Sequence, residues 1–471
     1  MATLTSIERI SDTVWEIPAS YKEGMRVPAR LFGTRSLIEA MDAGVTEQIT
    51  NVACLPGIEG YVCCMPDGHW GYGFPIGGVA AMRMEDGVIS PGGIGFDINC
   101  GMRLVLTGLT YAEVKPHLHA LVDRLFHRVP AGVGTRGFVR ISKAEFLEML
   151  TQGSHWCVAK GYGWPEDLER TEETGRIADA DPDAVSNRAV ERGLDQIGTL
   201  GSGNHYLEIQ VVKKENIFDP TLAEKWGLFP EQVVIMFHCG SRGFGHQVAS
   251  DYLERFLEVM GPKYGLKVPD RELACAPISS PEGQAYLKAM RCAINMSFAN
   301  RQVILHRLRE VFSQELIKTA EELGMHQVYD VAHNTAKIEE QMIDGKLKKL
   351  VVHRKGATRA FDGQPVIIGG SMETGSYLLT GIPSSAQAFF STAHGAGRTM
   401  SRTQARRQFD GRALQQNMEK NGIYVRSTSW KGLAEEAGPA YKNVDEVVES
   451  AEKAGLSRRV ARFIPVGNIK G

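Results

Sequence analysis

The feature that most constrains the fold is that chemically reactive side chains occur in short glycine-rich motifs spread from residue 97 to residue 470. In the decapeptide GGIGFDINCG, residues 92–101, Asp97 and Cys100 stand three residues apart. Glycine permits tight turns and close approach of a ligand, so the carboxylate and the thiol can point to one position. Both groups are metal ligands. Taken alone, the stretch is also compatible with a buried cysteine beside a turn aspartate.

Three histidines stand at the ends of predicted strands, where the backbone is rigid enough to hold a ligand: His205, His238 and His333. Ligands bind at such strand ends in open α/β sheets. One histidine in this position is usually a hydrogen-bonded structural residue, but three of them together with Asp97 and Cys100 favour a metal site. Such a site requires the chain to bring distant segments together within one domain.

Five ligands are one too many for an ordinary tetrahedral zinc site. Two metal ions that share a bridging thiolate fit the set better, and two-metal sites are common in phosphoryl chemistry. Ligand softness favours zinc for a cysteine ligand, whereas carboxylate and imidazole are also compatible with manganese. The residues therefore predict a dinuclear site and leave the metal open.

A second group surrounds His394, which lies among small residues and is followed by Arg398 and Arg402. A neutral imidazole is a competent nucleophile towards phosphorus, and arginine can stabilise the charge that develops on phosphate oxygens. A core histidine beside a helix start is an equal alternative. Glycine amides, hydroxyls, a carboxylate and an amine that suit phosphate, ribose or guanine form a third group: Asn204, Glu208, Gly369, Gly370, Ser371, Met372, Ser376 and Lys470.

The composition is that of an ordinary globular protein, with 43% hydrophobic and 23% charged residues in 471. Its formal net charge of −2 provides no overall basic field, so a nucleic acid would have to bind a local patch. The eight cysteines form no CxxC pair, the opening residues contain no apolar run typical of a signal peptide, and no apolar run approaches about 20 residues. We therefore expect a cytoplasmic protein with reduced thiols and no membrane association.

Nine motifs together resemble the RtcB-type RNA ligase family, the tRNA-splicing ligases that join RNA 3′-phosphate and 5′-hydroxyl ends. In chain order they are PDGH at 66–69, GFDINCG at 95–101, GSGNHYLEI at 201–209, FHCGSRGFG at 237–245, DVAHN at 330–334, HRKGATRA at 353–360, GGSM at 369–372, HGAGR at 394–398 and the terminal IKG. The least matched region, about 138–195, is expected to be a family-variable insertion.

The predicted fold class is α+β, with mixed β-sheets flanked by helices in one large domain, residues 1–471. Apolar runs predict strands at 61–65, 79–82, 101–106, 233–237, 328–332 and 366–368, and helical periodicity predicts helices at 36–50, 111–128, 245–260, 281–323 and 444–454. Residues 66–78 contain so much glycine and proline that we expect a shaped loop there.

The resemblance implies roles for particular residues. One manganese ion would be held by Asp97, Cys100 and His205, and a second by Cys100, His238 and His333. His394 would take GMP from GTP, and Tyr441 would stack on the base. GTP contacts would fall on Asn204, His205, Tyr206, Leu207, Glu208, His333, Asn334, Gly369, Gly370, Ser371, Met372, Ser376, His394, Gly395, Ala396, Gly397 and Lys470. RNA contacts are expected at Arg354, Lys355, Arg359, Arg398 and Arg402.

The implied reaction proceeds through a histidine–GMP intermediate and an RNA(3′)pp(5′)G end, and a 2′,3′-cyclic phosphate would first be opened. The expected substrates are tRNA halves or damaged RNA, and the protein archease is a candidate activating partner. Two alternatives remain from the residues themselves: a dinuclear metal-dependent phosphoesterase that does not use GTP, and a non-enzymatic metal-binding or RNA-binding module.

Overall fold

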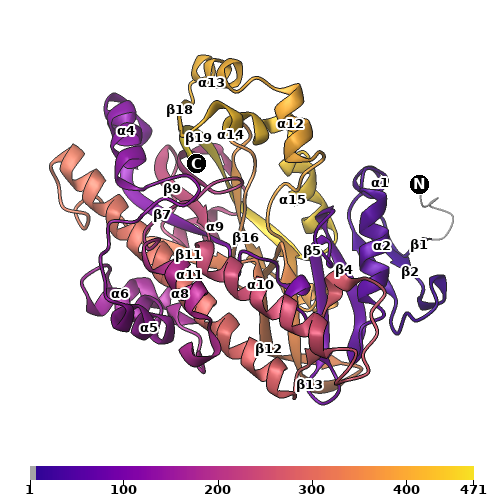
Figure 1. Ribbon diagram of the computed structural model, residues 1–471. Coiled ribbons are helices and arrows are strands. Elements are labelled where there is room, and N and C mark those ends of the chain that lie inside the picture. The colour runs from indigo at the N-terminus through magenta and orange to yellow at the C-terminus, as the bar shows by residue number, and fades with distance from the viewer. Residues whose placement is uncertain (1–6) are drawn as a thin grey trace.

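Two large β-sheets form the frame of the computed structural model, which describes residues 7–471 (Figure 1). The first six residues of the predicted domain lie outside this range. The first sheet has the strand order β1 (Glu8–Arg9), β2 (Val14–Ile17), β3 (Ala29–Phe32), β4 (Ile58–His69), β5 (Ile76–Arg83), β13 (Lys346–Lys355) and β12 (Asn334–Ile343).

The second sheet carries the ends of the strands that matter for function. Its order is β11 (Gln327–Ala332), β7 (Gly101–Thr110), β9 (Gln232–Cys239), β8 (Tyr206–Ile217), β19 (Ser457–Lys470), β16 (Ser376–Gly381) and β15 (Pro365–Ile368), with β18 (Tyr424–Ser427) beside β19. Two short pairs are β6 (Val88–Ile89) with β10 (Ala276–Pro277), and β14 (Ala357–Arg359) with β17 (Ser391–Ala393). Pairs β3–β4 and β18–β19 are parallel and the other pairs within the sheets are antiparallel, so both large sheets are mixed, as predicted.

Helices flank these sheets, which confirms the α+β class (Figure 1). They are α1 (Arg35–Glu39), α2 (Ala43–Val52), α3 (Tyr111–Val114), α4 (Leu118–Arg128), α5 (Lys143–Gln152), α6 (Ser154–Ala159), α7 (Pro165–Glu169), α8 (Asn187–Leu194), α9 (Pro220–Lys225), α10 (Arg242–Val259), α11 (Pro281–Leu316), α12 (Arg402–Gln408), α13 (Gly411–Lys420), α14 (Trp430–Glu435) and α15 (Val444–Lys453). Within residues 7–471 no helix has both the length and the apolar character needed to cross a membrane.

The buried helix α11 joins parts of the chain that are far apart in sequence. It is 36 residues long, packs against α4, α5, α6 and α10, and contributes to two of the hydrophobic cores. The core on one side of it also contains Trp15, Phe146, Trp156 and Val351. Residues 138–195 therefore pack into the common core, although their proposed variability within a family stays a prediction.

The expectation of a shaped loop over residues 66–78 is wrong for most of its length. Strand β4 continues through Pro66, Asp67, Gly68 and His69, and β5 begins at Ile76, so only residues 70–75 connect the two strands. The pairing of β4 with β5 shifts register between Cys64 and His69. Such an irregularity accommodates proline and glycine within a strand.

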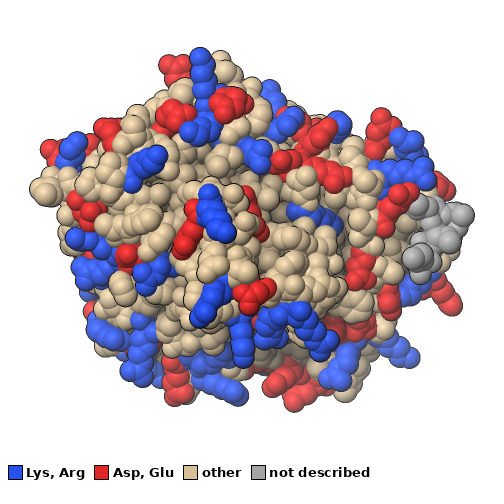
Figure 2. All heavy atoms as spheres, turned by 90° about the horizontal axis from the view of Figure 1, so that it is seen from above, with Lys and Arg blue, Asp and Glu red and all other residues tan. Residues whose placement is uncertain are grey.

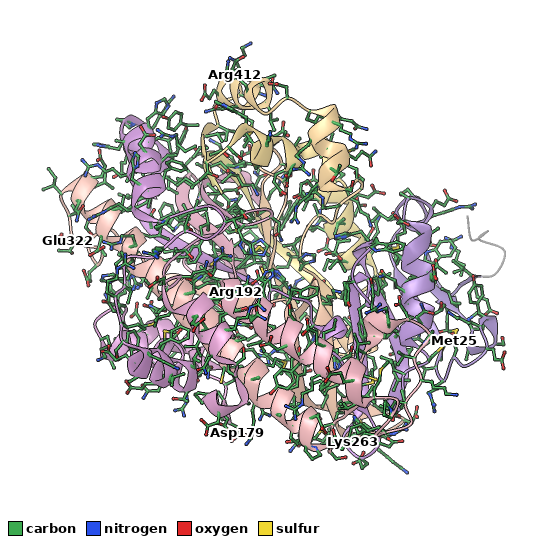
Figure 3. The ribbon with its side chains drawn as sticks, in the orientation of Figure 1. Met25, Asp179, Arg192, Lys263, Glu322 and Arg412 are labelled. Atoms are coloured by element: carbon green, nitrogen blue, oxygen red, sulfur yellow. The ribbon has the colours of Figure 1, made fainter. Side chains whose placement is uncertain are left out.

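The surface carries charges of both signs without a large field of one sign on the face seen from above (Figure 2). This agrees with the net charge of −2. The molecule extends from Glu322, which follows α11, to Met25, which precedes β3, at opposite ends of the view in Figure 3. All eight cysteines, which fall within the described residues, are free.

Candidate active site

The predicted metal ligands come from four neighbouring strands of the second sheet. Cys100 precedes β7, His205 precedes β8, His238 lies in β9 and His333 follows β11. The strands are adjacent in the order β11-β7-β9-β8. Since the first residue of β7 pairs with both Cys239 and Ala332, this register places the four residues at one end of the sheet.

The ligand atoms lie within contact distance of one another. Cys100 Sγ is 3.3 Å from His205 Nε2 and 3.1 Å from His238 Nε2. Asp97 Oδ2 is 2.8 Å from His205 Nε2, and His238 Nε2 is 3.0 Å from His333 Nε2. They form two triads, Asp97–Cys100–His205 and Cys100–His238–His333, and the ligand atoms in each lie within 4.8 Å of one another. Cys100 belongs to both triads, which is the arrangement expected of a thiolate that bridges two metal ions.

The donor set fits a pair of divalent cations. Asp97 Oδ1 and His333 Nδ1 are buried and have no hydrogen-bond partner among the described residues. Burial, reinforced by neighbouring imidazoles, lowers the pKa of His238 and His333 well below the ordinary value, so both rings are neutral and present lone pairs. Burial and the charge of Asp97 raise the pKa of the Cys100 thiol, an effect that a bound cation reverses by stabilising the thiolate.

A cavity of about 770 Å³ opens beside the second triad. Its wall includes His238 and His333 of that triad. It also includes most of the residues predicted to contact GTP: Asn204, Tyr206, His333, Asn334, Gly369, Gly370, Ser371, Met372, His394, Gly395, Ala396, Gly397 and Lys470. The volume is within the usual range for small-molecule sites.

Four of the predicted GTP residues do not line this cavity: His205, Leu207, Glu208 and Ser376. The Leu207 side chain lies on the face of β8 opposite to that of Tyr206 and packs in a hydrophobic core. Glu208 accepts hydrogen bonds from Gln210 Nε2, at 2.6 Å, and from the Asn468 amide. Gln210 Nε2 also lies 3.4 Å from Ser376 Oγ, so Glu208 and Ser376 form part of the layer behind the wall.

His394 is held by an aspartate to which the sequence assigned no role. The imidazole Nδ1 lies 2.6 Å from Asp67 Oδ2, and the backbone amides of His394 and Gly395 donate to the same oxygen at 3.1 and 3.2 Å. Burial opposes ionisation of Asp67, but the adjacent imidazole and these hydrogen bonds lower its pKa below the ordinary value. Since Nδ1 faces the carboxylate, Nε2 is the ring atom left for a substrate.

Two further contacts place His394 beside the metal ligands. Its ring centroid is 4.7 Å from that of His333. Gly397, with φ of 73°, brings its backbone so close to Asp67 that an added Cβ would lie 2.1 Å from the Asp67 carbonyl oxygen. Only glycine permits this approach, which fixes the segment after β17 against β4.

A buried carboxylate, Glu436, gathers the cations and the tyrosine on the cavity wall. It is 2% exposed and lies 3.3 Å from Arg398, 3.5 Å from Arg402 and 3.5 Å from Lys470, and it accepts a hydrogen bond from the Tyr441 hydroxyl. Burial opposes its ionisation, but Lys470 and Arg398 lower the pKa of Glu436 to about 2. The Arg398 guanidinium carbon is 4.8 Å from the centre of the Tyr441 ring. Tyr441 also packs against a hydrophobic core and lines the cavity, so its ring is held in place at the wall.

Three of the five residues expected to contact RNA lie elsewhere. Arg354 is fully buried and pairs with both oxygens of Glu339, at 2.6 and 2.9 Å. Lys355 is buried and donates to the carbonyl oxygens of residues 72, 74 and 92. Arg359 is 2.6 Å from Glu173. These cations are neutralised or hydrogen-bonded inside the protein, so the expected RNA contacts are reduced to Arg398 and Arg402, which line the cavity.

Sequence reasoning also missed Arg242, whose Nη1 lies 3.1 Å from His205 Nδ1 and orients that ring. Asp67 lies in the motif PDGH and Arg242 in the motif FHCGSRGFG. Their positions in these motifs could have indicated that both belong to the site. Glu436 stands in the sequence EEAGPAY, which contains no comparable signal.

Comparisons with known proteins agree with this geometry. Residues 48–471 match the family model described as tRNA-splicing ligase RtcB. The tRNA-splicing ligase RtcB of Thermococcus kodakarensis is 51% identical over the whole of both chains, and that of Archaeoglobus fulgidus is 50% identical over 99% of each chain. The RNA-splicing ligase RtcB of Mycobacterium bovis is 50% identical over 90% of this chain and 100% of its own. The chain therefore belongs to the RtcB family.

Proposed function

We propose that this protein is an RNA ligase that joins an RNA 3′-phosphate, or a 2′,3′-cyclic phosphate after opening, to a 5′-hydroxyl with GTP and two manganese ions. One observation carries the proposal: His394 lies at the wall of a nucleotide-sized cavity, its ring centroid 4.7 Å from that of a metal-triad histidine. Family membership supports RNA joining as the reaction. Participation of tRNA halves, damaged RNA or archease, and a cytoplasmic location, stay predictions.

His394 acts as the nucleophile in the first step. Asp67 holds the proton on Nδ1, so the Nε2 lone pair attacks the α-phosphorus of GTP and pyrophosphate leaves. An oxygen of the RNA 3′-phosphate then attacks the histidine-bound phosphorus, the N–P bond breaks, and an RNA(3′)pp(5′)G end forms. Finally the 5′-hydroxyl attacks the RNA 3′-phosphorus, its proton is released, and GMP leaves.

The two triads would hold the metal ions, which supply neutralisation of phosphate charge when bound. The remaining wall residues bind and orient. Tyr441 offers a ring face to guanine, and Lys470 and Arg398 bring positive charge to the phosphates. Glu208 and Ser376, which the resemblance assigns to guanine, lie behind the wall, so their proposed role is to support the wall residues through Gln210 and Asn468.

Incubation with α-labelled GTP and manganese tests the proposal. We expect covalent label on the wild-type protein that is acid-labile and base-stable, because a histidine phosphoramidate has that stability, and none on His394→Ala. His306→Ala is the matched control, since His306 lies on α11 and outside the cavity. Wild type should then join RNAs with 3′-phosphate and 5′-hydroxyl ends.

Two results would contradict the proposal. Manganese-dependent release of phosphate from RNA ends without any label from GTP would support the phosphoesterase alternative. Retained RNA binding by a protein that binds no metal ion would support a non-enzymatic module.

A further inference from the structure

We propose that the indole of Trp70 is a stacking platform for an unpaired RNA base next to the ends being joined. The inference rests on the proposed function for the identity of the substrate. Trp70 is 58% exposed and yet lines the same cavity as His394. Tryptophan is enriched at binding interfaces, because it combines a large apolar ring with a polar N–H group.

The Trp70 ring is seated on backbone on one side. A Cβ added to Gly44, at the start of α2, would lie 2.0 Å from ring atom Cε3 and 2.2 Å from Cζ3. The glycine therefore allows the ring to rest directly on the helix backbone. The exposed remainder of the indole is open to the cavity and to solvent, which is the arrangement that lets a nucleobase stack.

The short connection that carries Trp70 is held at several points. The Gln48 amide donates to the Gly71 carbonyl at 2.6 Å and accepts from the Gly71 amide at 3.1 Å. The Gly73 amide donates to Glu272 Oε2 at 2.8 Å. Lys355 donates to the carbonyl oxygens of Tyr72 and Phe74. The loop that carries the indole is thus preorganised before a ligand binds, which reduces the conformational entropy lost on binding.

The charges around the cavity mouth separate the base from the phosphate. Asp42, the N-cap of α2, lines the wall on the Trp70 side and disfavours phosphate there. Arg402, half exposed at the start of α12, lines the same cavity and attracts phosphate. A single RNA strand can therefore place its backbone near α12 and a base on Trp70, the combination of cation and aromatic ring that single-strand binders use.

Equilibrium binding of fluorescein-labelled single-stranded RNA with a 3′-phosphate, in manganese and without GTP, tests the inference. We expect Trp70→Ala to raise Kd at least about fivefold, the lower end of the effect of base–aromatic stacking. Trp70→Phe keeps a ring and should stay within about twofold of wild type. Trp430→Ala is the matched control, because Trp430 is 47% exposed but does not line the cavity.

RNAs that lack one base at successive positions from the end identify the stacked nucleotide. At one position the abasic RNA should weaken wild-type binding by the same factor as Trp70→Ala, and the variant should show no further loss. The factor should be unchanged at higher salt, whereas Arg402→Ala should reduce the salt dependence. An affinity of Trp70→Ala equal to that of wild type would overturn the inference. So would a Trp70→Ala substitution that weakens the binding of every abasic RNA as much as that of the intact RNA.

The assay separates this inference from the proposed function, since it requires no guanylation or ligation. If the wild-type protein takes no label from GTP but one abasic position still weakens RNA binding as expected, the ligase proposal is wrong and the proposal for Trp70 stands. Normal ligation by Trp70→Ala with a normal Kd would remove the platform and leave the ligase. A Trp70→Ala protein that instead loses capture of a protein partner, with RNA affinity intact, would also overturn it.

Discussion

The pairing of His394 with Asp67 determines which ring nitrogen can react. Asp67 Oδ2 accepts from two backbone amides and faces the imidazole Nδ1, so one oxygen fixes both the backbone and the tautomer. A carboxylate that orients a catalytic histidine in this way contributes strongly to rate in other enzymes. The consequence is that chemistry at residue 394 depends on residue 67, more than 300 positions away.

Asp67→Asn should lower the rate of guanylation at least about 100-fold, because an amide favours the tautomer that protonates Nε2. The measurement is single-turnover labelling with GTP. Asp86→Asn is the control, since Asp86 is an exposed partner of Arg83 at 2.6 Å. Labelling of Asp67→Asn at the wild-type rate would show that the carboxylate has no orienting role.

Glu208 provides a pH-dependent prediction. Burial raises the pKa of Glu208 to about 7, from an ordinary value of 4.5. The folded protein therefore binds more protons than the unfolded chain between these values, and the stability contributed by Glu208 is complete below pH 4.5 and lost as the pH rises through about 7. In Glu208→Gln, whose amide stays neutral, the melting temperature relative to wild type should rise across this window. A difference in melting temperature between the variant and wild type that stays constant from pH 5 to 8 would contradict the prediction.

Among the helices and strands, α11 has a particular role, because one of its side chains holds together the segments that carry the metal ligands. Arg301 donates to the carbonyl oxygens of Asn99 and Cys239, at 2.8 and 3.0 Å, which adjoin Cys100 and His238. It also pairs with both oxygens of Asp330 in β11, at 2.7 and 2.8 Å. The helix thus fixes β7, β9 and β11 relative to one another.

Arg301→Gln should lower the free energy of unfolding by about 3 kcal/mol, because it removes one partner of a buried ion pair. Arg103 still pairs with Asp330, at 2.8 Å, which limits the loss. Urea unfolding measures the stability, and calorimetric titration with manganese should show weaker binding. Arg35→Gln, which breaks an exposed pair with Glu39, should cost no more than about 1 kcal/mol. Equal effects of the two changes would contradict the role of α11.

The sequence predicted elements that local patterns determine and missed those that depend on distant partners. Apolar runs located β9 and β11, and the histidines at their ends followed. Strand β19 contains three arginines, a proline and a glycine and was not predicted, since its place in the sheet depends on β8 and β16. Arg354 was expected to contact RNA because its partner, Glu339, is identified only by the fold.

For the whole molecule, the metal ligands join segments from residue 97 to residue 333, so bound ions should stabilise the complete fold. We expect manganese at a hundredfold excess over its Kd to add about 2.7 kcal/mol of stability for each ion bound, and chelation to remove it. Melting curves with and without manganese provide the measurement. Cys100→Ser should lose most of the shift, whereas Cys54→Ser should keep it, because Cys54 belongs to neither triad. An equal shift in both variants would place the ions elsewhere.

Strand β19 lies between β8 and β16, and its final residue, Lys470, lines the cavity. A ribosome adds this strand after all the strands it pairs with, so a nascent chain holds an open gap in its sheet until residues 457–470 emerge. The order of synthesis thereby makes the sheet and this part of the cavity wall complete in the same step.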